Sequence, residues 1–111
     1  MHLAKIRIAT VMLTFIIFFI SSGNSQAQPS RFSALRYIKD GDTLNYRLLF
    51  PDYDTFRKYP LVVFLHGAGE RGNDNEAQLK WGVTNFATDE TMSHHPAFVL
   101  APQCPEKMQW S

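Results

Sequence analysis

An apolar run that ends in a glycine-rich segment constrains the fold of this chain more than any other feature. The five residues LVVFL, at 61–65, lead directly into His66 and then into GAGERG at 67–72. Because the run does not alternate with polar residues, it predicts a strand covered on both faces, as in the parallel sheets of α/β proteins. A second apolar segment, AFVLA at 97–101, predicts another such strand. The roughly thirty residues between them suit a right-handed crossover that contains a helix.

The segment before this run predicts an antiparallel hairpin. Residues 34–50 read ALRYIKDGDTLNYRLLF, with apolar residues alternating on both sides of Asp40 and Gly41. Asp-Gly between alternating segments is a strong hairpin signal, so we expect strands at about 35–40 and 43–50 with one face buried. Residues 28–33 are predicted to be a polar leader. Residues 51–60 are predicted to be a loop whose aromatic side chains cover the sheet edge.

Helix-capping residues follow the glycine-rich segment. Asn73, Asp74 and Asn75 can each cap a helix, and Glu76 lies three residues after Asn73, as in a capping box. The sequence therefore predicts a crossover helix that starts near Asn73 and is ended or interrupted at Gly82. A second helical stretch is predicted, more weakly, at 83–91.

The N-terminal residues have the layout of a secretory signal peptide. Lys5 and Arg7 precede an apolar run from Ile8 to Ile20, and Ser25-Gln26-Ala27 fits a small-x-small cleavage site. The run is shorter than the roughly 20 residues of a membrane-spanning helix, although an uncleaved anchor stays an alternative. We expect a signal peptide at 1–27, a mature chain at 28–111, secretion or a periplasmic location, and no stable membrane insertion after cleavage.

The charge of the chain argues against nucleic acid as a partner. The formal net charge is +1, two of the basic residues lie in the predicted signal peptide, and no basic run occurs elsewhere. A near-neutral chain lacks the positive charge that attracts nucleic acid or anionic membranes. The single cysteine, Cys104, is predicted to be a small buried residue, with a bond to a cysteine beyond Ser111 as the alternative.

The glycine-rich segment is the candidate for chemistry. Active sites of open α/β folds lie at the carboxyl ends of the parallel strands, and glycines there leave backbone N–H groups accessible to a ligand. Such N–H groups could stabilise an oxyanion. A simple tight turn is the competing interpretation. Phosphate binding is disfavoured, because neither glycine-rich phosphate motif occurs and Glu70 would repel the anion.

The segment LVVFLHGAGERGNDNEAQLKWG, together with FVLAPQCPEKMQW, resembles a secreted α/β-hydrolase. The resemblance extends over 34–111 and is strongest to the esterases related to prolyl oligopeptidase, dienelactone hydrolase, and feruloyl or polyhydroxybutyrate-type esterases. It implies an α/β fold with an incomplete α/β-hydrolase sheet, formed by the hairpin and two parallel strands with a helical crossover. It also implies a serine hydrolase of carboxylic esters, small or polymer-linked, that needs no cofactor.

The resemblance assigns roles to the residues after the first strand. The N–H of Ala68 would be an oxyanion donor, in a loop shaped by Gly67 and Gly69. His66 would orient this loop by hydrogen bonding. A further pair, Glu70 and Arg71, would brace the pocket mouth by contacting each other or neighbouring backbone.

The sequence departs from that family in one respect: it has no G-x-S-x-G nucleophile motif. We therefore expect the Ser/Asp/His triad after Ser111, and we expect this chain alone to be inactive and poorly soluble. One alternative is a truncated, non-catalytic product or interaction remnant. Another is a parent protein that is a peptidase like prolyl oligopeptidase.

Other reactive residues predict no site. His66, His94, His95 and Cys104 lack the spacing of zinc ligands, so no metal is expected. The segment NDNE lacks the calcium-loop pattern. A carbohydrate-binding module would show a mostly antiparallel pattern, so the two tryptophans are predicted to be core residues.

Overall fold

The computed structural model describes residues 29–52, 54 and 56–111. The predicted signal peptide at 1–27 lies outside these residues. Within the described ranges, no helix is both long and apolar enough to cross a membrane.

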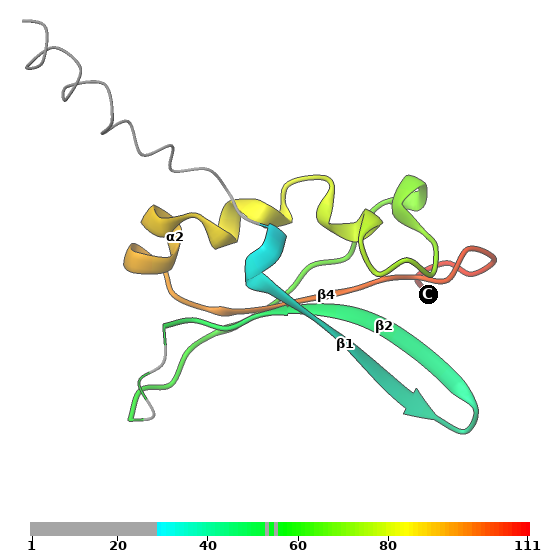
Figure 1. The fold of residues 1–111 in the computed structure, drawn as a ribbon, viewed down its shortest axis with the longest axis horizontal. Helices are drawn as coiled ribbons and strands as arrows, with labels where there is room; N and C mark the ends of the chain where they lie inside the picture. The colour runs from blue at the N-terminus through cyan, green and yellow to red at the C-terminus, as the bar shows by residue number, and fades with distance from the viewer. Residues whose placement is uncertain (1–28, 53, 55) are drawn as a thin grey trace, which may run out of the picture.

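The described chain forms one mixed sheet of four strands (Figure 1). The strands are β1 (Phe32–Lys39), β2 (Asp42–Leu49), β3 (Leu61–Val63) and β4 (Phe98–Pro102). Their order across the sheet is β1-β2-β4-β3. The neighbours β1 and β2 are antiparallel, as are β2 and β4, whereas β3 and β4 are parallel. The predicted hairpin and the predicted parallel pair are thus both present.

The hairpin turn has the geometry that its sequence predicts. Asp40 and Gly41 both have positive φ, at 51° and 84°, as a two-residue turn of type I′ requires. The strands pair from Lys39↔Asp42 to Phe32↔Leu49. The first strand starts earlier than predicted, because Phe32 is buried in the core with 1% exposure. Interpreting 28–33 as a leader was therefore wrong for its last residues.

The crossover between β3 and β4 is built mainly from short 3-10 turns. These turns are η2 (Ala68–Glu70), η3 (Ala77–Leu79) and η4 (Val83–Ala87), and one six-residue α-helix follows, α2 (Asp89–His94). A further 3-10 turn, η1 (Pro29–Arg31), precedes β1. The prediction of a helix starting near Asn73 was wrong, and the weaker prediction at 83–91 corresponds to η4 and the start of α2.

The physical reason for the missing helix lies in its predicted cap. Asn75 has a positive φ of 55°, which no α-helix accommodates. The carboxylate of Asp74 accepts hydrogen bonds from the N–H groups of Glu76 and Ala77, at 3.0 and 3.1 Å. These bonds close a single turn at η3. The predicted break at Gly82 is observed as a positive φ of 77° directly before η4.

The two faces of the sheet differ in cover. In Figure 1 the short helical segments of the crossover lie on one side of the sheet, and the buried core lies between them and the strands. The core residues are Phe32, Leu49, Leu79, Val83, Ala87, Val99 and Ala101. On the other face, Leu61, Val63 and Leu65 are 61%, 54% and 54% exposed. The prediction that this run is covered on both faces was therefore wrong for the described residues.

Aromatic residues contribute less to the core than expected. The loop aromatics were predicted to cover the sheet edge, but Tyr59 packs edge-on against Phe98 of the inner strand β4, and Phe56 is 97% exposed. Trp81 and Trp110 are 62% and 38% exposed, so predicting both as core residues was wrong.

Candidate functional site

The glycine-rich loop leaves the sheet at the carboxyl end of β3. The N–H of Phe64 still donates to the carbonyl of Leu100 on β4, at 2.9 Å, and the chain turns away after that bond. Turn η2 then begins at Ala68. The loop and the C-terminal segment enclose a hollow of about 200 Å³. Its lining residues are Gly67, Ala68, Arg71, Cys104, Gln109 and Trp110.

His66 is buried and uses both ring nitrogens. Its Nε2 accepts a hydrogen bond from the N–H of Cys104 at 2.9 Å, and its Nδ1 lies 2.6 Å from the carbonyl oxygen of Gly67. A carbonyl can only accept, so Nδ1 carries the hydrogen and the ring is the neutral tautomer. The indole N–H of Trp110 donates to the His66 carbonyl at 3.0 Å. With both nitrogens engaged, this ring offers no free lone pair to a metal ion.

The backbone N–H of Ala68 has no hydrogen-bond acceptor among the described residues. Ala68 also lines the 200 Å³ hollow. The glycines on either side differ in their surroundings. A Cβ at Gly67 would lie 3.2 Å from the Glu70 carboxylate, whereas a Cβ at Gly69 would meet nothing within 4 Å.

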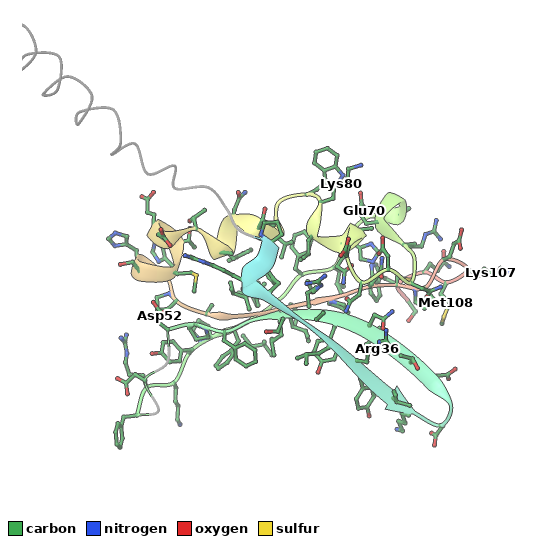
Figure 2. All side chains as sticks on the ribbon, in the orientation of Figure 1. Arg36, Asp52, Glu70, Lys80, Lys107 and Met108 are labelled. Atoms are coloured by element: carbon green, nitrogen blue, oxygen red, sulfur yellow. The ribbon has the colours of Figure 1, made fainter. Side chains whose placement is uncertain are left out.

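Arg71 ties the loop to the C-terminal segment. Its Nε donates to the carbonyl of Ala68 at 3.0 Å, and its Nη1 donates to the carbonyl of Met108 at 2.9 Å. Figure 2 places Glu70 and Met108 at the same end of the molecule. The ion pairs found in the described ranges join other residues, so Arg71 contacts backbone rather than Glu70. Whether this pair braces a pocket mouth stays a prediction.

A buried polar network holds the second half of the loop, and sequence reasoning missed it. Gln103 directly follows β4 and is 1% exposed. Its Oε1 accepts from the N–H of Asn75 at 2.7 Å. Its Nε2 donates to the carboxylate of Asp74 at 2.8 Å and to the carbonyl of Glu70 at 3.2 Å. The only signal in the sequence is a polar residue directly after an apolar strand, a position that usually reads as the start of a loop.

Asn75 connects this network to the hairpin. Its side-chain N–H groups donate to the carbonyls of Leu35 and Tyr46, at 3.3 and 3.1 Å. Its carbonyl accepts from Nε of Arg47 at 2.6 Å, and its Oδ1 accepts from Nε2 of Gln78 at 2.6 Å. The loop is thus fixed to β1 and β2 as well as to β4.

The network also acts on the charge of Asp74. The N–H of Glu76, the side chain of Gln103 and the N–H of Ala77 all donate to its carboxylate, and they hold the pKa of Asp74 below its ordinary value. Because the hydrogen bonds favour the ionised form, this carboxylate stays charged to a lower pH than a free aspartate.

A larger hollow of about 650 Å³ adjoins the first, between the hairpin and the C-terminal segment. The two hollows share Cys104, Gln109 and Trp110. The hairpin side of the larger hollow is lined by Tyr37, Lys39, Asp40, Asp42, Thr43 and Leu44.

The candidate metal ligands do not converge. No group of three His, Cys, Asp or Glu side chains that could hold a metal ion occurs within the described part of the chain. His94 and His95 are exposed at the end of α2. Cys104 is buried and free, which agrees with its prediction as a small buried residue.

Comparison with known proteins links this fold to an esterase. No family model matches the sequence, and no curated protein sequence matches it. A solved structure described as the crystal structure of a thermostable esterase is similar to this chain, with a TM-score of 0.69 and 47% sequence identity. The match covers 74% of this chain, which spans 23% of the length of that esterase. The mixed four-stranded sheet and this similarity together fit an incomplete α/β fold that resembles part of a hydrolase.

Proposed function

We propose that this chain is the oxyanion-loop segment of a secreted or periplasmic serine hydrolase that acts on carboxylic esters, small or polymer-linked. Two observations at Ala68 carry the proposal together: the residue lines the 200 Å³ hollow, and its N–H has no acceptor within the described residues. The similarity to the thermostable esterase, at 47% identity, supports the ester as the substrate class. The signal-like residues 1–27 support export.

In ester hydrolysis this segment would have one role, to stabilise the oxyanion. Attack of a nucleophile on an ester carbonyl places negative charge on the carbonyl oxygen, and a preorganised N–H donor stabilises that charge. Ala68 would supply such a donor. The bonds of His66 and Arg71 to neighbouring backbone would keep the donor in place.

The nucleophile would come from outside these residues. The sequence contains no G-x-S-x-G. Residues that this sequence does not contain would therefore supply the serine that attacks the ester, and the acid and histidine that activate it. Breaking the ester C–O bond would release the alcohol and leave an acyl-enzyme on that serine, and water would then hydrolyse it to the carboxylic acid and free serine. No step of this scheme requires a metal or an organic cofactor.

A chimera tests the proposal directly. Residues 29–111 replace the equivalent part of the thermostable esterase, and hydrolysis of p-nitrophenyl acetate is measured. We expect the chimera to hydrolyse the ester. A chimera that is folded by circular dichroism and inactive would contradict the proposed function.

Two substitutions in the chimera test the donor itself. Ala68→Pro removes the N–H and should lower kcat by about 10²–10³, the usual cost of one oxyanion donor. Ala68→Gly keeps the N–H and should lose far less. Equal kcat values for the two variants would exclude this N–H as an oxyanion donor.

A further inference from the structure

We infer that Gln103 is the positioning residue of the oxyanion loop, residues 66–72. Its side-chain amide fixes the position of the Ala68 N–H. This inference rests on the proposed function for the identity of the loop. Gln103 does not line the 200 Å³ hollow, and its hydrogen bonds go to Glu70, Asp74 and Asn75, so it would act through the loop.

Two adjacent residues directly after β4, Gln103 and Cys104, contact the chain on either side of Ala68 in turn η2. Before the turn, the N–H of Cys104 donates to the ring of His66 at 2.9 Å. At its last residue, the side chain of Gln103 donates to the carbonyl of Glu70 at 3.2 Å. Ala68 lies between these two attachment points. Because both points are on one strand end, the position of Ala68 follows the position of β4.

The amide of Gln103 fits this place in one orientation. Its Oε1 faces an N–H donor, Asn75, and its Nε2 faces two acceptors, the Asp74 carboxylate and the Glu70 carbonyl. Rotating the amide by 180° would turn all three hydrogen bonds into like-with-like contacts. A side chain without both a donor and an acceptor at this reach would leave buried backbone groups unpaired.

Gly72 leaves the space that Gln103 occupies. A Cβ at this residue would lie 3.3 Å from Nε2 of Gln103, closer than most real Cβ contacts. The N–H of Gly72 also donates to the carbonyl of Cys104 at 3.0 Å. The last glycine of the segment therefore serves the contact with Gln103, whereas the earlier ones flank the Ala68 N–H.

The test compares the same substitution at two equally buried glutamines. Gln103→Met and Gln78→Met are made in the full 111-residue chain, labelled with ¹⁵N and studied by NMR in a mild detergent. Gln78 is 0% exposed and bonds to Asn75 and to Ala101, but to no residue of the 66–72 segment. We expect Gln103→Met to shift the amide signals of Ala68 and Gly69, and Gln78→Met to leave them in place.

Hydrogen exchange measures how strongly the Gln103 side chain protects the N–H of Asn75. The N–H of Asn75 loses its acceptor in Gln103→Met, so its exchange should become at least about tenfold faster. Unshifted Ala68 and Gly69 signals in a folded Gln103→Met variant would overturn the inference. Equal shifts in the Gln78→Met control would overturn it as well, because the loop would then respond to any loss in the network.

A third variant keeps the test informative if Gln103→Met does not fold. Gln103→Glu has the same size, but near neutral pH its carboxylate would face the carboxylate of Asp74 and the carbonyl of Glu70. In acid the new carboxyl group regains one donor hydrogen. We expect the Ala68 signal to be displaced at pH 7 and to return toward the wild-type position at pH 4, with wild type titrated in parallel to account for Asp74. A signal that does not recover would contradict positioning by hydrogen bonding.

Neither the amide shifts nor the exchange rates depend on ester hydrolysis. An inactive chimera would therefore refute the proposed function without changing the result for Gln103.

Discussion

The covered and the open face of this sheet have similar apolar residues and opposite surroundings. On the covered face, Val99 and Ala101 of β4 are fully buried under the crossover. On the open face, Leu61 and Val63 of β3 remain more than half exposed. An apolar residue in the sequence is thus one whose burial is favourable, but its apolar character does not show which segment of the chain, if any, packs over it. The difference also predicts that the stability of this chain comes mainly from packing on the covered face of the sheet.

The largest expected difference between the two faces comes from truncating one large residue on each. Phe32→Ala removes a ring that is 1% exposed, and we expect it to lower the free energy of unfolding by about 3–5 kcal/mol, a large part of the stability of a small domain. Leu61→Ala removes a side chain that is 61% exposed and should cost less than about 1 kcal/mol. Urea unfolding followed by circular dichroism measures both.

Equal costs for the two substitutions would show that the open face is covered in solution. Because long apolar edges and faces favour association, the measurement is repeated at two protein concentrations. A cost at Leu61 that grows with concentration would identify self-association as the cover.

Two glycines of the loop should differ in their contribution to stability at the polar end of the covered face. Gly72→Ala places a Cβ 3.3 Å from the Gln103 amide at a residue with φ of +155°, and should destabilise the fold by about 1–3 kcal/mol. Gly69→Ala meets no atom within 4 Å and should change stability by less than about 0.5 kcal/mol. Thermal melts of the two variants, side by side, make the check. A reversed order would mean that the loop is not packed against Gln103.

The smallest expected effect is electrostatic. The pKa of Asp74 is lowered in the fold, so its ionised form contributes stability above the ordinary value of 3.8, and this contribution is lost as the pH falls through the lowered pKa. Asp74→Asn should therefore be less stable than wild type at pH 7, with the difference shrinking below about pH 4. Urea midpoints at pH 7 and pH 3 test this. A difference that is constant with pH would show that the charge of Asp74 contributes nothing.

The predictions that succeeded depend on local chemistry. Asp40-Gly41 specifies its turn through backbone conformation alone, and the hairpin forms around it. The parallel pairing of β3 with β4 follows from two apolar runs separated by a crossover. The position of the loop after β3 follows from the same pattern.

The predictions that failed depend on tertiary contacts. Asn75 looks like a helix cap in the sequence, but its side chain bonds to the carbonyls of Leu35 and Tyr46, which lie far away along the chain. From the sequence, Gln103 is predicted to be an ordinary loop residue, because none of its neighbours in the sequence indicates that the 66–75 segment packs onto it. The roles of Ala68 and of His66 stay predictions, since they concern a reaction that the fold alone does not display.

The 66–75 segment is attached to two consecutive residues that directly follow β4, Gln103 and Cys104, and this has a consequence for how the protein can vary. An inserted or deleted residue anywhere between His66 and Asn75 would put one attachment out of register with the other. At the tip of the hairpin, Asp40 and Gly41 make no backbone hydrogen bond to another loop within the described part of the chain. Among relatives, we therefore expect the loop to change in composition but keep its length, whereas the hairpin can grow or shrink.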